Sequence, residues 1–127
     1  MARKKLLIVD DEKMVHDVLV RLLKRQIDIT NKMSAEEALD DLAHELERGV
    51  FDVVLLDVRM PGLPDGVDFF RYLQRFERAP HVIFMTGDDS VVGALAGATQ
   101  TRCLSKPFSS SELREALREY LEPACPS

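Results

Sequence analysis

The sequence has no tryptophan, only two cysteines and no excess of positive charge. Its net charge of −5 argues against the basic surface that nucleic-acid binding needs. No apolar run approaches the roughly 20 residues of a membrane span, and the basic start turns acidic too early for a signal peptide. Cys103 and Cys125 fit a reducing compartment. We therefore expect a cytoplasmic protein that binds no nucleic acid by this chain alone and no membrane.

The chain does contain enough apolar material for one core. Hydrophobic residues make up 46% of the 127 residues and charged residues 31%, a balance that argues against disorder. The length suits one domain. We expect a single domain over 1–127, with its core at 5–121 and a tail at 122–127.

Strand-like and helix-like segments alternate along the chain. Short apolar runs predict strands at 5–9, 50–57, 81–86 and 102–105, and an alternating segment predicts a more exposed strand at 27–30. Apolar residues at helical spacing predict a helix after each strand, and the fourth, at 89–99, is weakened by Gly93 and Gly97. The first helix is expected to bury a stripe of five residues, Val15, Val18, Leu19, Leu22 and Leu23.

Local signals mark where the helices begin and end. Ser34 with Glu37 and Ser109 with Glu112 have the spacing of capping boxes. Gly49 is expected to end the second helix, residues 60–66 to form a loop, and the third helix to end before Pro80. The last helix is expected to extend to Tyr120.

Five βα units with apolar strands predict an α/β fold with a doubly wound, five-stranded parallel sheet covered by helices on both faces. In such sheets ligands bind beyond the carboxyl ends of the strands. Polar residues follow four strands at that edge: Asp10 and Asp11 follow the first, Asp57 ends the third, Thr86 ends the fourth and Lys106 follows the fifth.

These residue types at one edge point to phosphoryl chemistry. Three neighbouring carboxylates repel one another, and Mg²⁺, which takes oxygen ligands, removes the repulsion. A metal, a lysine and a hydroxyl around a carboxylate suit phosphoryl transfer, with the carboxylate itself as acceptor. Each residue alone also fits a helix cap or an ordinary turn. Their joint placement indicates a site.

Four segments, LLIVDDE, VVLLDVRMPG, VIFMTG and LSKPFS, resemble in order those of the receiver domain of bacterial two-component response regulators. The resemblance covers about residues 5–121 and implies a flavodoxin-like, CheY-like fold. It implies that Asp57 accepts the phosphoryl group and that Asp11, Asp57 and the backbone carbonyl of Arg59 hold Mg²⁺. Asp10 would act largely through a water on the metal.

By the same resemblance, Lys106 would pair with the phosphoryl oxygens, Thr86 would hydrogen-bond them, and the Lys106–Pro107 bond would be cis. The donor would be a histidine kinase or phosphotransfer protein. The output would be a changed partner surface on the last two helices and the fifth strand. The downstream partner is unknown, and a monomer or weak homodimer is expected. The chain could be a stand-alone regulator or the receiver of a hybrid kinase.

The sequence departs from the family at Cys103, where an aromatic residue is usual, and we expect a short or mobile fourth helix. Arg59 and Asp88 flank the acceptor position, and we hypothesise that they slow hydrolysis of the phosphoryl group. Two other functions stay open: an interaction module that does not use phosphate, and an aspartyl-phosphate hydrolase. Arg59 argues against the hydrolase, because those enzymes carry an acidic residue there. The histidines, His16, His44 and His81, are expected to be structural or surface residues.

Overall fold

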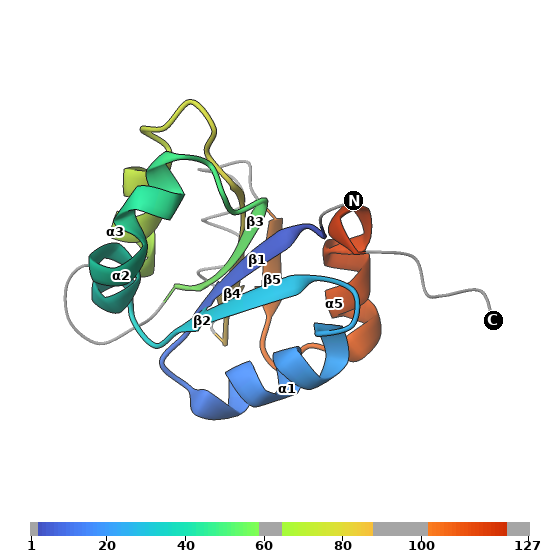
Figure 1. Cartoon of the computed structure of the whole chain (residues 1–127). Coiled ribbons are helices and arrows are strands. Elements are labelled where there is room, and N and C mark those ends of the chain that lie inside the picture. The colour runs from blue at the N-terminus through green and yellow to red at the C-terminus, as the bar shows by residue number, and fades with distance from the viewer. Residues whose placement is uncertain (1–2, 59–64, 88–101, 122–127) are drawn as a thin grey trace.

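Five parallel strands form one sheet, and each overlaps a segment that the sequence predicts as a strand. The computed structural model describes residues 3–58, 65–87 and 102–121. The strands are β1 (Lys5–Val9), β2 (Asp28–Lys32), β3 (Val53–Asp57), β4 (His81–Thr86) and β5 (Arg102–Ser105). They lie in the order β2-β1-β3-β4-β5 (Figure 1). β1, β3 and β4 are buried along almost their whole length, whereas β2 is a more exposed edge strand.

The described helices cover both faces of the sheet (Figure 1). They are α1 (Lys13–Leu23), α2 (Ala35–Glu47), α3 (Gly66–Leu73) and α5 (Ser110–Ala116), followed by a short 3-10 helix, η1 (Arg118–Tyr120). Leu7 and Val9 of β1 pack on the α2 and α3 side, and Leu6 and Ile8 pack on the α1 and α5 side. This alternation follows from the two-residue period of a strand, and it gives the sheet two apolar cores. The predicted fold class is confirmed.

The predicted starts of two strands are wrong, because the backbone N–H before each strand bonds to the preceding helix instead. β3 begins at Val53 rather than at residue 50, since the Val50 N–H donates to the Glu45 carbonyl and closes the turn after α2. Gly49, with φ of +71°, makes that turn as predicted. β2 begins after Ile27, whose N–H still donates to the Leu23 carbonyl of α1.

The helix caps match the sequence in part. Ser109 and Glu112 form the predicted capping box in both directions. Ser34 accepts from the Glu37 N–H, but the Glu37 carboxylate accepts from Met33 rather than closing the box.

The limits of the last described helices also differ from the predictions. A further capping box, Asp65 with Asp68, starts α3 at Gly66, which was predicted as loop. α3 ends at Leu73, before Pro80 as predicted, whereas the last helix ends at Ala116, short of the predicted Tyr120, and is followed by the 3-10 helix η1.

The buried face of α1 matches the predicted apolar stripe except at Val18, and it also includes His16. Val18 is 49% exposed and its neighbour Met14 is 77% exposed, whereas His16 is only 5% exposed. Leu19 and Leu23 are buried as predicted. The face that α1 turns to the sheet therefore includes the imidazole ring of His16, near the carboxyl edge of the sheet. The apolar side chains of Met14 and Val18 remain on the surface.

Several predictions fall outside the described residues. These concern the helix at 89–99, Arg59, Asp88, Cys125 and the tail at 122–127. Within the described part of the chain, no helix is long and apolar enough to cross a membrane.

Candidate functional site

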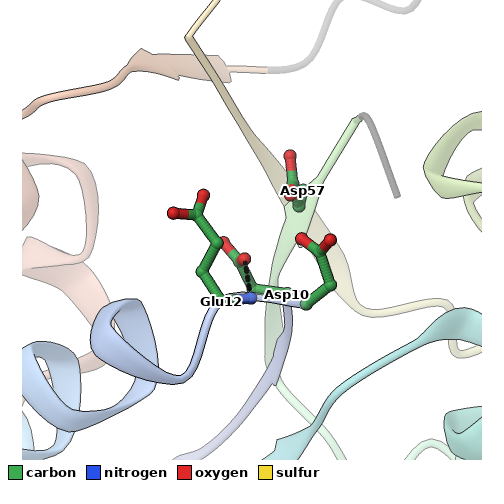
Figure 2. Close-up of side chains that lie close together, drawn as sticks. Asp10, Glu12 and Asp57 are labelled. Carbon is green, nitrogen blue, oxygen red and sulfur yellow. Dashed lines mark hydrogen bonds between the residues drawn. The ribbon is translucent and has the colours of Figure 1, made fainter. Parts of the chain in front are cut away.

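Four carboxylates gather at the carboxyl edge of the two central strands. Asp10 and Asp11 follow β1, Glu12 is the N-cap of α1, and Asp57 is the last residue of β3. One oxygen of each carboxylate lies within 4.8 Å of those of the others. Figure 2 shows the side chains of Asp10, Glu12 and Asp57 close together at this edge. The strand order explains the cluster, because β1 and β3 are adjacent and ligand sites form where the order of strands reverses.

Asp10 is fully buried, and both its backbone and its carboxylate are held. Its N–H donates to the Lys32 carbonyl at 3.2 Å, and its own carbonyl lies 2.7 Å from His16 Nε2. Its Oδ1 accepts from the Glu12 N–H at 2.9 Å, the bond dashed in Figure 2. Its Oδ2 accepts from Lys106 Nζ at 2.8 Å. Asp10 is thus a fixed anchor beside the more exposed carboxylates of Asp11 and Glu12.

Lys106 reaches three of the four carboxylates. Its Nζ lies 2.8 Å from Asp10, 3.1 Å from Glu12 and 3.6 Å from Asp57. Burial lowers the pKa of Lys106, but the hydrogen bond to Asp10 and the nearby negative charges outweigh it, so the pKa lies above its usual value. The side chain therefore stays a cation at neutral pH and is shared among acids that would otherwise repel one another.

Asp57 and Thr86 end adjacent strands and are almost completely buried, at 4% and 1% exposure. Both line a pocket of about 850 Å³ together with Lys106, and α1 contributes Met14 and Val18 to the same pocket. A buried carboxylate that opens into a pocket beside a lysine is placed to react with a bound group, which an ordinary strand-end cap does not require.

The cluster fits a hard divalent cation. All four candidate ligands offer carboxylate oxygens, which Mg²⁺ prefers over nitrogen or sulfur. Lys106 brings one positive charge against four carboxylates, so the group keeps a negative charge that a cation would neutralise. Asp11 is exposed, which leaves a ligand open to solvent for metal entry.

The structure brings together the site residues predicted within its described part: Asp10, Asp11, Asp57, Thr86 and Lys106. The predicted backbone ligand, Arg59, lies outside the described residues. Glu12 was not predicted, although it contacts Lys106 and belongs to the carboxylate cluster. The available signal was the run of three acids directly after a buried strand.

Two features around Lys106 bear on the family resemblance. The Lys106–Pro107 bond is cis, as the resemblance predicts. Cys103, three residues earlier on β5, is a half-buried free thiol that packs against the core on the α2 and α3 side. Burial raises the pKa of this thiol, so it behaves as a small apolar side chain.

A family model described as "Response regulator receiver domain" matches residues 6–118. The chain belongs to this family. A curated relative, the positive alginate biosynthesis regulatory protein of Pseudomonas aeruginosa, is 36% identical over 121 residues, which cover 92% of this chain and 47% of the relative. The chain spans about half the length of the curated relatives that it matches.

Solved structures agree with this assignment. The signal receiver domain of an HD domain-containing protein from Pseudomonas fluorescens Pf-5 has a TM-score of 0.78 and 25% identity, and the match covers 94% of each chain. A BeF3-activated DrrB receiver domain also has a TM-score of 0.78 and 25% identity, over 94% of this chain and 97% of that one. Receiver domains are signalling domains of two-component systems, in which they interact with histidine kinases or phosphotransfer proteins.

Proposed function

We propose that this receiver domain accepts a phosphoryl group on Asp57 from a phosphohistidine, in the presence of Mg²⁺. The placement of Asp57 carries the proposal: the carboxylate is nearly buried, lies 3.6 Å from Lys106 and opens into the pocket. In the transfer, an Asp57 oxygen forms a bond to phosphorus while the bond from phosphorus to the histidine nitrogen breaks. The released imidazole then takes up a proton. Such transfer depends mainly on positioning and charge neutralisation.

The proposed metal ligands are Asp11, Asp57 and the backbone carbonyl of Arg59, with Asp10 as an indirect ligand. When bound, Mg²⁺ supplies positive charge against the phosphoryl oxygens and the carboxylates. The hydrogen bonds of Asp10 support this division, because both its carboxylate oxygens already accept, one from the Glu12 N–H and one from Lys106, whereas the Asp11 carboxylate is exposed.

Lys106 and Thr86 are the proposed contacts to the phosphoryl group. The Lys106 ammonium already lies near Asp57, so a small movement away from Asp10 brings it to a phosphoryl oxygen. Thr86 ends the strand beside β3 and lines the same pocket, so its hydroxyl can hydrogen-bond the modified side chain. Phosphorylation adds about 1.5 to 2 negative charges, and this addition would shift a balance between two conformations.

The exposed apolar residues of α1 support a protein donor. Met14 and Val18 line the pocket that leads to Asp57 and are on the surface. A histidine that delivers its phosphoryl group through this pocket must bring its own protein surface against α1. We propose that a histidine kinase or phosphotransfer protein covers these two side chains during transfer. We also propose that the domain acts in the cytoplasm, as a monomer or weak homodimer.

The proposed output is a change of the partner surface on β5, α5 and the segment before β5. Cys103 replaces the aromatic residue that the family usually has on β5, so a swinging ring is not available here. This substitution is also the one observation that favours an interaction module that does not use phosphate. The complete set of acids and the lysine favours a receiver domain that is phosphorylated over an interaction module that does not use phosphate.

Intact-mass spectrometry with acetyl phosphate and Mg²⁺ tests the proposal. Wild type is expected to gain one phosphate adduct that is lost when EDTA is present, and Asp57→Asn is expected to gain none. Adducts on both proteins would show that Asp57 is not the acceptor. If wild type gains no adduct and beryllofluoride leaves its amide NMR spectrum unchanged, the interaction module replaces the proposed function.

A further inference from the structure

His16 is a buried polar residue on the face that α1 packs against the sheet. Its ring is 5% exposed, and Leu19 and Leu23 of the same helix are fully buried. Both ring nitrogens have partners: Nε2 lies 2.7 Å from the Asp10 carbonyl oxygen, and Nδ1 lies 2.8 Å from Asn31 Oδ1. The ring therefore joins three elements, namely α1, the end of β1 and the edge strand β2.

The partner of Nε2, the Asp10 carbonyl oxygen, fixes which of the two atoms donates the hydrogen bond. A carbonyl oxygen only accepts, so Nε2 carries the proton and donates it to Asp10. At Nδ1 the neighbouring atom is Asn31 Oδ1, and because a side-chain amide offers an acceptor on one side and a donor on the other, Asn31 can pair with this nitrogen whichever role it takes. A buried ring with both nitrogens bonded is satisfied, which offsets the cost of placing a polar group in this face.

The hydrogen bond from His16 to the Asp10 carbonyl also restrains the next residue, Asp11. The carbonyl belongs to the peptide unit that joins Asp10 to Asp11, and a peptide unit is planar. Holding its oxygen therefore also sets the direction in which the Asp11 N–H and Cα leave the strand. Because Asp11 is exposed, the place of its carboxylate in the cluster depends on this backbone direction.

We infer that His16 is a positioning residue for the magnesium site: it orients the peptide that carries Asp11 while touching neither the metal nor the acceptor. The inference rests on the proposed function, since it assigns His16 a role toward the metal of that same site. Residues one bond behind a metal ligand typically change metal affinity about 10- to 100-fold when they are removed. A residue that only fills the core changes stability and leaves metal affinity as it is.

Two substitutions separate the bonds of the ring. The amide nitrogen of His16→Gln takes the place of Nε2 and keeps the bond to Asp10. The shorter His16→Asn takes the place of Nδ1, keeps the contact with Asn31 and loses Asp10. Leu23→Ala is the matched control, because Leu23 is buried on α1 and does not line the pocket. All three variants are expected to unfold at lower temperature than wild type.

Magnesium affinity, measured by calorimetric titration, is the deciding readout. His16→Asn is expected to bind Mg²⁺ about tenfold more weakly, whereas His16→Gln and Leu23→Ala stay near wild type. In EDTA, the amide NMR signals of Asp11 and Glu12 are expected to move further in His16→Asn than in His16→Gln, because both variants lose the ring but only His16→Asn also loses the bond to Asp10. Equal affinities and equal shifts in the two histidine variants would overturn the inference.

The two proposals fail differently. A wild-type protein that binds no Mg²⁺ contradicts the proposed function. The NMR comparison in EDTA then still decides whether His16 orients the Asp11 peptide, because it needs no metal. If both histidine variants bind Mg²⁺ as wild type does and only their stability falls, His16 is a packing residue and the proposed function stands.

Discussion

The Lys106 ammonium lies 2.8 Å from Asp10 and 3.6 Å from Asp57. The lysine is thus paired more closely with a buried neighbour of the proposed acceptor than with the acceptor itself. Glu12, at 3.1 Å, holds it from the solvent side. A phosphoryl group on Asp57 would add acceptor oxygens within reach of the same ammonium. If Asp57 is phosphorylated as proposed, the lysine would have to exchange partners, and the strength of its present contacts would set the cost of that exchange.

Removing the lysine should lower the stability of the fold but strengthen its binding of Mg²⁺. In Lys106→Met, the buried Asp10 carboxylate loses its charged partner, so we expect the free energy of unfolding in EDTA to fall by about 1 to 3 kcal/mol. Mg²⁺ should bind more tightly, because the cation that competes for Asp10 is gone. Urea unfolding and calorimetric titration measure the two effects. Unchanged stability with weaker Mg²⁺ binding would contradict the resting ion pair.

Glu12 should restrain Lys106 before phosphorylation. In Glu12→Gln the lysine is held less firmly, so we expect phosphorylation by acetyl phosphate to be faster, about two- to fivefold, as the loss of one exposed ion pair implies. Stability should hardly change. Mass spectrometry over time gives the rate, and Glu47→Gln, an exposed glutamate at the end of α2, is the matched control.

A double variant shows whether Glu12 acts through the lysine. If it does, Glu12→Gln should have no further effect on the rate in the Lys106→Met background. The same acceleration in both backgrounds would mean that Glu12 acts only by repelling the anionic donor.

Gly66 lets α3 begin directly against the backbone at the end of β3. A Cβ at this position would lie 2.2 Å from the Asp57 carbonyl oxygen and 2.9 Å from Val58 Cα, which is too close. Gly66→Ala should therefore lower the free energy of unfolding by about 1 to 3 kcal/mol and slow phosphorylation. Gly87→Ala is the control, because a Cβ there meets nothing within 4 Å. If both variants unfold alike, the close approach of α3 has no consequence.

The charge of Lys106 gives the stability a defined pH dependence. Its pKa is raised in the folded protein, since burial is outweighed by the bond to Asp10 and by nearby acids. A cation with a raised pKa stabilises the fold fully below its unfolded value of about 10.4, and the contribution is lost as pH rises through the folded pKa. The stability difference between wild type and Lys106→Met should therefore be constant from about pH 6 to about pH 9. A difference that already shrinks near pH 8 would contradict this assignment.

The site at the strand ends could be predicted from the sequence, because the apolar runs show both where the strands lie and which residues stand at their carboxyl ends. Asp10, Asp57 and Thr86 each stand at the end of an apolar run, and parallel strands bring such ends to one edge whatever the loops do. The order of strands was limited only to a few possibilities, since right-handed crossovers allow more than one arrangement.

The sequence did not predict what depends on contacts between distant segments. Val18 has the spacing of a buried residue but lies beside the open pocket, while His16 is buried because Asp10 and Asn31 satisfy its ring. Glu12 belongs to the site because Lys106, 94 residues away, reaches it. Hydrophobic spacing carries no information about such partners, so a polar residue in a core and a glutamate at a helix start go unrecognised.

The most direct test of the account is to locate the phosphoryl group on the chain. Borohydride reduces an aspartyl phosphate to homoserine, so protein treated with acetyl phosphate and Mg²⁺ and then reduced can be digested and sequenced by mass spectrometry. The account predicts homoserine at position 57 and aspartate unchanged at positions 10 and 11. Homoserine at position 10 or 11, with Asp57 unmodified, would contradict it.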